Sequence, residues 1–171
     1  MKIGLLSDTH AHLDPRIFDY LEPCQEIWHA GDFGSVAVSD ELSAFRPLRA
    51  VYGNIDGAEL RQIHPLHQRF TIEGVRVWMT HIGGYPGHYP TTIRQILQVQ
   101  ASDLFICGHS HILRVMRDPQ YNNMLLMNPG AAGLEGFHKM RTMLRFDIEK
   151  GKISNAEVIE LGLRDAIKDP S

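Results

Sequence analysis

Near its amino end the chain carries Lys2-Ile3-Gly4-Leu5-Leu6-Ser7-Asp8-Thr9-His10, a short apolar run that ends in polar residues. The run from Ile3 to Leu6 has the length and the aliphatic character of a buried β-strand. Asp8 and His10 come directly after it, and both side chains are common metal ligands. The same unit, a buried strand that ends in ligand-bearing residues, recurs along the chain.

Four further apolar runs end in the same way. They cover residues 26–29, 48–52, 75–79 and 103–107, and the residues that follow them are Asp32, Asn54, His81 and the pair His109 and His111. The five units lead with residues 8, 32, 54, 81 and 109, so the intervals are 24, 22, 27 and 28 residues, as in successive β-α-β units. Because ligands of open α/β sheets lie beyond the carboxyl ends of the strands, these side chains are predicted to meet at one rim of one sheet.

The segments between the runs predict an α/β fold. Helical spacing of apolar residues occupies 15–21, 35–45 and 91–99, so strands and helices alternate. In the second half, the apolar runs and turn signals predict antiparallel hairpins within 70–77, 113–127 and 144–159. A single sheet with helices on both faces and two sheets packed as a sandwich both fit this order.

The composition is that of one globular domain. The 171 residues are 43% hydrophobic and 22% charged, so we expect a single domain over residues 1–171, with 161–171 as a loose carboxyl-terminal tail. Seventeen basic and 20 acidic side chains give a net charge of −3, which argues against the broad basic surface that long nucleic acids require. No apolar stretch approaches the ~18 residues of a membrane span, and the first residues do not resemble a signal peptide, so we expect a cytoplasmic protein with no membrane partner.

The strand ends supply seven metal-ligand side chains: Asp8, His10, Asp32, Asn54, His81, His109 and His111. One such residue near a strand end is generally structural, but the joint pattern at five strand ends favours metal binding. Seven donors are too many for one ion with open positions, and they suit two ions that share a bridging carboxylate. Four imidazoles beside three oxygen donors favour manganese, iron, zinc or cobalt over magnesium or calcium.

The other histidines are interpreted differently. His29 stands inside a strand run, so we expect a packed or hydrogen-bonded residue of the sheet. His64 and His67 flank a proline and are predicted to be solvated. His12 and His88 stand in loops near the expected rim and are candidates for contact with a substrate.

The motifs Asp8-x-His10, Gly31-Asp32, Gly53-Asn54-x-Asp56, His81 and Gly108-His109-x-His111 resemble those of the calcineurin-like metallophosphoesterases. The short length, Asn128-Pro129-Gly130 and the terminal hairpin make the chain similar to the small single-domain bacterial and archaeal phosphodiesterases of that superfamily. The resemblance extends from Met1 to about Leu161.

This resemblance implies a four-layer α/β/β/α sandwich of two mixed sheets flanked by helices. It also implies two divalent metal ions, with manganese as the first choice and iron, zinc, nickel or cobalt as alternatives. One ion would take Asp8, His10 and His111, the other Asn54, His81 and His109, and Asp32 would bridge them. The residues implied for catalysis are Asp32, Asn54, Asp56 and His109, with Asp56 behind the ligands, where it orients a histidine or a loop.

One position departs from the family pattern. Many members carry Gly-Asn-His-Asp, in which the histidine protonates the leaving group, and here Ile55 takes that place. Isoleucine cannot transfer a proton, so phosphomonoesters with poor leaving groups are disfavoured as substrates. Which group replaces the histidine is open from the sequence.

Three functions remain in competition. The first is a metal-dependent phosphodiesterase that acts on a small substrate through a hydroxide activated by two metals. The second is a non-catalytic scaffold of the same fold, as in the retromer scaffold subunit of this superfamily, and the third is a hydrolase of a non-phosphate ester. The complete ligand set favours an enzyme, because scaffolds are expected to lose ligands. A homo-oligomer is also open, through Trp78, Phe137 or Tyr121.

Overall fold

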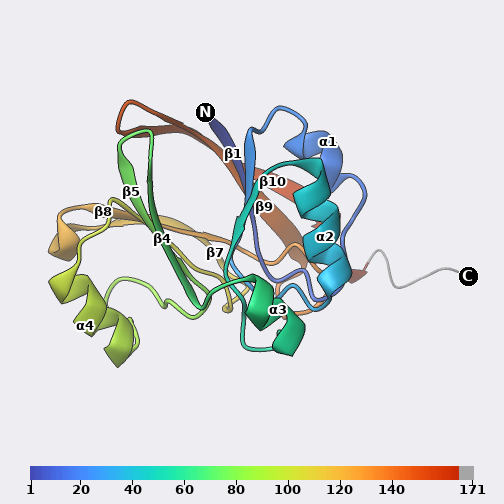
Figure 1. Ribbon diagram of the computed structural model, residues 1–171, viewed down its shortest axis with the longest axis horizontal. Coiled ribbons are helices and arrows are strands. Elements are labelled where there is room, and N and C mark those ends of the chain that lie inside the picture. The colour runs from blue at the N-terminus through green and yellow to red at the C-terminus, as the bar shows by residue number, and fades with distance from the viewer. Residues whose placement is uncertain (166–171) are drawn as a thin grey trace, which may run out of the picture.

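The computed structural model describes residues 1–165, in which ten strands form two mixed five-stranded sheets (Figure 1). The first sheet has the order β10-β9-β1-β2-β3. Its strands are β1 (Lys2–Leu6), β2 (Glu26–His29), β3 (Leu48–Ala50), β9 (Met140–Glu149) and β10 (Lys152–Leu163). Strands β1, β2 and β3 run parallel, whereas β9 pairs antiparallel with both β1 and β10.

The second sheet has the order β4-β5-β6-β8-β7. Its strands are β4 (His67–Ile72), β5 (Val75–Thr80), β6 (Leu104–Ile106), β7 (Leu113–Asp118) and β8 (Met124–Pro129). The middle strands β5, β6 and β8 are parallel, and the edge strands β4 and β7 are antiparallel to their neighbours. A short 3₁₀ helix, η1 (Pro119–Tyr121), connects β7 to β8.

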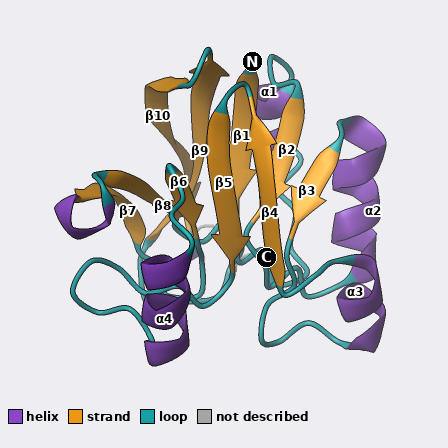
Figure 2. Ribbon diagram, turned by 60° about the vertical axis from the view of Figure 1, so that its left-hand side comes forward, coloured by secondary structure: helices purple, strands orange, loops and turns teal. Residues whose placement is uncertain are grey.

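The helices cover the outer faces of the two sheets (Figure 2). They are α1 (Ile17–Leu21), α2 (Val36–Phe45), α3 (Ala58–Ile63) and α4 (Thr91–Val99). Helices α1, α2 and α3 share one apolar cluster with the outer face of the first sheet, and α4 shares another with the second sheet. The predicted four-layer α/β/β/α sandwich is therefore confirmed.

The main core lies between the sheets. In β1, Ile3 and Leu5 point into it, while Leu6 packs against the helices on the other face, as the two-residue period of a strand dictates. Trp28 fills the centre through T-shaped contacts with Phe70 of the second sheet and Phe146 of the first. Both faces of the central strands are covered, which is why their sequences are continuously apolar rather than alternating.

Several sequence expectations need correction. The metal-ligand units do not share one sheet, because β1, β2 and β3 belong to the first sheet and β5 and β6 to the second. Helix α3 was not predicted, since six residues are too few to show a clear helical period. Trp78, proposed for an oligomer interface, is fully buried in the second sheet.

The expectation of a loose tail from residue 161 is wrong over residues 161–165. Strand β10 continues to Leu163, and Leu161 packs with the helices of the first sheet. Arg164 is buried, and its backbone N–H donates to the carbonyl of Lys139. The remainder of the predicted tail, residues 166–171, lies outside the described residues. Among residues 1–165, no helix has the length and apolar character needed to cross a membrane.

Two leucines at the carboxyl-terminal end of β10 should respond differently to truncation. Leu161 is 2% exposed and Leu163 is 51% exposed. We expect Leu161→Ala to lower the free energy of unfolding by about 2–4 kcal/mol because it leaves a cavity. The matched control Leu163→Ala should change it by less than about 0.5 kcal/mol. Urea unfolding measures both, and equal effects would contradict a folded carboxyl-terminal strand.

Candidate metal centre

The seven predicted ligands converge where the two sheets meet at one end of the sandwich. Asp8 and His10 follow β1, Asp32 follows β2, and Asn54 follows β3, all from the first sheet. His81 follows β5, and the pair His109 and His111 follows β6, both from the second sheet. Six of the seven form two adjoining groups, Asp8 with His10 and His111, and Asp32 with His81 and His109. Asn54 lies beside the second group.

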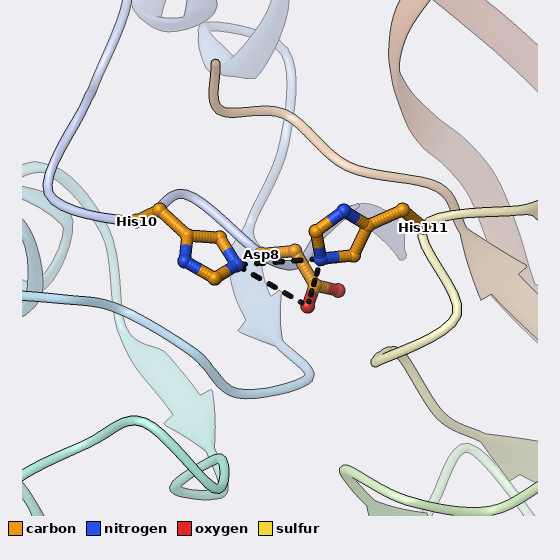
Figure 3. A group of neighbouring side chains, drawn as sticks. All are labelled: Asp8, His10 and His111. Carbon is orange, nitrogen blue, oxygen red and sulfur yellow. Dashed lines mark hydrogen bonds and ion pairs between the residues drawn. The ribbon is translucent and has the colours of Figure 1, made fainter. Parts of the chain in front are cut away.

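The first group surrounds one oxygen of Asp8 (Figure 3). Asp8 Oδ1 lies 3.1 Å from His111 Nε2 and 3.9 Å from His10 Nε2, and the two imidazole nitrogens are 3.3 Å apart. This oxygen is buried and has no hydrogen-bond partner among the described residues. An unpaired buried carboxylate oxygen is costly unless a cation balances it, so the arrangement fits a metal ion.

The second group lies around Asp32 and Asn54. Asp32 Oδ2 is 3.2 Å from His81 Nε2, and Asn54 Oδ1 is 3.0 Å from that nitrogen and 2.9 Å from His109 Nδ1. Asp32 Oδ2 is also 3.7 Å from His10 Nε2 of the first group. Asp32 therefore lies between the two groups, in the place that a bridging carboxylate would occupy.

Hydrogen bonds outside the groups orient the ligands. His81 Nδ1 donates to the carbonyl of Ala30 at 2.7 Å, so the lone pair of His81 is left on Nε2, which faces Asp32. Asp8 Oδ2 accepts hydrogen bonds from Ser7 Oγ at 2.6 Å and from the backbone N–H of His109 at 3.1 Å. These contacts occupy one oxygen of Asp8 and leave the other for an ion.

The charges of the site favour a cation. Burial lowers the pKa of His109, and this keeps its ring in the neutral form that binds metals. Burial opposes ionisation of His81 and of Asp32, yet their mutual attraction outweighs it. The pKa of His81 is therefore raised and that of Asp32 lowered. The buried carboxylates thus attract a positive charge to this point, which a bound metal ion would provide.

Five of the seven ligands have left-handed backbone conformations. The φ angles are 55° at Asp8, 46° at His10, 57° at Asp32, 67° at His109 and 59° at His111. Such angles are uncommon for residues other than glycine, and they cluster at functional sites. The pairs Asp8/His10 and His109/His111 are therefore not in extended strand, and His109 and His111 diverge into different groups.

Glycines next to the ligands allow the loops to approach one another. A Cβ atom on Gly53 would overlap the carboxylate of Asp32, and one on Gly108 would overlap Ser7 Oγ and crowd the Asp8 carboxylate. Glycine before the ligand in these two motifs is thus a packing requirement of the opposing loop.

Asp56 is buried behind the ligands and positions their loops. Its carboxylate accepts hydrogen bonds from the backbone N–H groups of Phe33, Gly34 and Gly53 at 3.2, 2.9 and 2.8 Å. It therefore joins the loop that follows Asp32 to the loop that carries Asn54. This placement agrees with the orienting role proposed for it.

Asn128, which belongs to the motif Asn128-Pro129-Gly130, positions a ligand loop as Asp56 does. Its side-chain nitrogen donates to the carbonyl of Gly108 and to Ser110 Oγ, at 2.9 and 3.1 Å. Its side-chain oxygen accepts from the N–H of Gly130 at 3.0 Å. Asn128 thus holds the loop that carries the last two histidine ligands.

The remaining histidines divide between packing and surface. His29 stacks on Phe33 at 3.8 Å between ring centroids and hydrogen-bonds Thr9 Oγ1, as expected for a sheet residue. The prediction for His64 is wrong, because His64 stacks on the other side of Phe33, at 4.8 Å, and its Nε2 lies 2.8 Å from Ser39 Oγ. His67 is exposed, as predicted.

The two substrate candidates differ in their surroundings. His88 is exposed and packs against Tyr85, at 4.6 Å between ring centroids. His12 is half-buried, and its Nε2 has no hydrogen-bond partner among the described residues. Neither belongs to the two ligand groups.

A hollow of about 670 Å³ opens beside the first group. Its lining consists of His10, Ala11, Gly34, Ile55, His111, Glu135, Gly136 and Phe137. Ile55 is 48% exposed there, so the position that departs from the family pattern does border the candidate site. The sequence did not place residues 135–137 at the site, because their loop carries no strand-end signal, and Phe137 was considered only for an oligomer interface.

Comparison with known proteins agrees with this geometry. The family profile described as the calcineurin-like phosphoesterase superfamily domain matches residues 1–151. A probable metallophosphoesterase of Methanothermobacter thermautotrophicus is 32% identical over 173 aligned residues, which cover 95% of this chain and 94% of the relative.

Solved structures share the fold. The structure of a novel archaeal phosphodiesterase has a TM-score of 0.71 and 26% identity, and the match covers 93% of this chain and 100% of that one. A Vps29 variant from Entamoeba histolytica has the same TM-score with 16% identity over 95% of this chain and 100% of its own. At that identity the second likeness concerns the fold alone.

Metal binding should stabilise the folded protein measurably. The ligands come from both sheets and are assembled only in the folded state, so an ion at 100 times its Kd adds about 2.7 kcal/mol to stability. We expect manganese to raise the thermal midpoint of chelator-treated protein, and calcium to raise it much less, because imidazoles disfavour calcium. The variant Asp8→Asn removes the charge of a proposed ligand and should show a smaller manganese-induced rise of the thermal midpoint. An unchanged midpoint in the wild type would contradict the metal assignment.

Proposed function

Because the chain belongs to the calcineurin-like phosphoesterase superfamily, we propose that it is a metal-dependent phosphodiesterase that hydrolyses small phosphodiesters. The observation that carries the proposal is the gathering of six of the seven donors into two adjoining groups that meet at Asp32, with Asn54 in contact with His81 and His109. The likeness to the archaeal phosphodiesterase structure supports the same reaction class.

In this proposal two divalent ions are held by the two groups of ligands. Asp8, His10 and His111 would hold one ion, and Asn54, His81 and His109 the other, with Asp32 shared between them. Two such ions supply Lewis acidity toward a phosphoryl group and lower the pKa of water. Manganese is the preferred metal, since the donors mix imidazole nitrogen with carboxylate and amide oxygen.

The protein's own charges leave the site suited to an anion. Asp8 and Asp32 contribute −2, and the four imidazoles are neutral when they bind metal. Two divalent ions would thus leave about +2, which attracts a phosphate group to the site. His10 and His111 border the hollow, so the phosphate would be bound at the wall that they form.

The leaving group meets no general acid at the family's usual position. The side chain of Ile55 offers no proton, and its backbone N–H is already donated to Asp32 Oδ1 at 3.0 Å. The reaction therefore depends on how readily the leaving oxygen departs as an anion. Diesters with acidic leaving groups fit this site better than alkyl phosphomonoesters.

The alternative is a non-catalytic scaffold for protein binding. The likeness of the fold to Vps29 is the observation that favours it. A scaffold does not need the left-handed ligand loops or the unpaired Asp8 oxygen, and this chain retains both. The enzyme is therefore the preferred proposal.

Asp32→Asn tests the shared ligand. The substitution removes a charge that attracts both ions, so we expect the loss of at least one of two bound manganese ions and of most hydrolysis of bis(p-nitrophenyl) phosphate. The control is Asp40→Asn, on the exposed face of α2, which should behave as wild type. Metal analysis and turnover are measured on the same samples. Full occupancy with unchanged turnover in Asp32→Asn would contradict the two-metal proposal.

Ile55→His tests the missing acid. A positioned general acid contributes ~10²- to 10⁴-fold, mostly for poor leaving groups. We expect the wild type to show a steep fall of log kcat/KM with leaving-group pKa across a series of aryl diesters, and Ile55→His to make that slope shallower. The control is Ile63→His, at a similarly exposed isoleucine of α3. A shallow slope in the wild type would show that another residue already donates the proton.

A further inference from the structure

One wall of the hollow beside His10 and His111 is formed by the loop of residues 133–139, between β8 and β9, which we call the wall loop. Phe137 of this loop is fully exposed although it lines the hollow, and Ile55 lines the hollow as well. Apolar and aromatic side chains that line a hollow together with a few polar groups are typical of a ligand-binding site.

The wall loop is fixed by the segment that follows β10. Arg164 is only 4% exposed, and its guanidinium donates hydrogen bonds to the backbone carbonyls of Gly133, Glu135 and His138. A single buried side chain thus binds three points of a seven-residue loop. Phe137 is therefore presented by an anchored loop.

The wall loop also touches a metal-ligand candidate directly. Gly136 has a φ of 118°, and a Cβ atom at this position would overlap Nδ1 of His111. The backbone beside Phe137 is thus in contact with the His111 ring. A group seated on Phe137 would lie next to the position proposed for the phosphate.

The charges of the hollow select the kind of group that fits. Its lining contains no lysine or arginine, and Glu135 is the carboxylate on the wall loop. A second phosphate would meet no cationic side chain here and would be repelled by Glu135. An uncharged, planar group would instead bury apolar area against Phe137 and Ile55.

We propose that Phe137 and Ile55 form a subsite for an aromatic ring carried by the substrate's phosphate, and that Arg164 positions this subsite. The inference rests on the proposed function and names its substrate class, a phosphodiester with an aryl or nucleobase group. Phe137 contacts the ring, Ile55 completes the apolar surface, and Arg164 acts only through the wall loop.

Binding of non-hydrolysable probes to the manganese-loaded protein tests the subsite without turnover. Phenylphosphonate and methylphosphonate carry the same phosphonate group and differ in the ring. Stacking on an aromatic side chain is worth enough that the wild type should bind the phenyl compound about 5- to 20-fold more tightly. A second pair, the methylenephosphonate analogues of uridine 5′-monophosphate and of ribose 5-phosphate, separates recognition of a nucleobase from recognition of an aryl group. Calorimetry measures all four Kd values.

Variants assign the preference to residues. Phe137→Ala should remove the preference for the ring and leave methylphosphonate binding unchanged, and Phe137→Tyr should restore it. Arg164→Gln should weaken the preference while metal content is retained, and a thermal melt verifies that this variant is folded. The matched control is Val99→Ala, which truncates an exposed apolar side chain at the end of α4 and should have no effect.

The outcomes separate the inference from the proposed function. Equal affinities for phenylphosphonate and methylphosphonate in the wild type, with hydrolysis of bis(p-nitrophenyl) phosphate intact, overturn the subsite alone. A dimer in the wild type that becomes a monomer in Phe137→Ala, measured by sedimentation, also overturns it, because Phe137 then covers a second copy. If no probe binds and no diester is hydrolysed, the proposed function fails and the subsite with it.

Discussion

The buried carboxylate of Asp8 determines how the loops of the two sheets meet at the candidate metal centre. One of its oxygens accepts hydrogen bonds from Ser7, in the loop after β1, and from the backbone of His109, in the loop after β6. Asp8 thereby connects the two sheets at the end where the ligands gather. Its other oxygen has only imidazole nitrogens near it and remains unpaired. A cation would satisfy this oxygen, so the same side chain that joins the sheets creates the demand for a metal.

The ligand loops are strained, and the sandwich core offsets that strain. Left-handed backbone at a residue other than glycine costs roughly 1–2 kcal/mol, and five ligands adopt it. The apolar contacts between the sheets, centred on Trp28, lie directly behind these loops and do not involve the ligands. The core can therefore hold the ligand side chains in place before an ion or a substrate arrives. Such preorganisation is what a charged site needs to act on a phosphate.

The sequence alone indicated that the seven candidate ligands lie at strand ends, because each one is tied to a local signal, a strand that ends in a polar residue. It predicted less well whatever depends on distant partners. The division of the strands into two sheets is set by pairing between segments far apart, such as β1 with β9, and not by local periodicity. His64 was placed in solvent because its stacking partner Phe33 is remote in sequence. The end of β10 was expected to be a tail, whereas Leu161 and Arg164 are buried by contacts with elements that lie far away in the sequence.

The ligand loops and the hollow beside them differ in chemistry, and we infer that they bind different parts of the substrate. The ligand loops provide all of the carboxylates and imidazoles of the two groups, so in the proposed function they would bind the ions and, through them, the phosphate. These ligands would not select among substrates that differ only outside the phosphate. In the proposal, the hollow selects the group attached to the phosphate. Ile55 provides apolar surface where many family members carry a proton donor, and the wall loop places Phe137 beside the same hollow. In the proposed function, the lack of an acid at residue 55 would limit the substrates to those whose leaving groups depart unaided, while the apolar surface would favour aryl and nucleobase groups. The two changes are compatible because aryl oxygens leave as comparatively stable anions, so one substitution at residue 55 can serve both selection and chemistry.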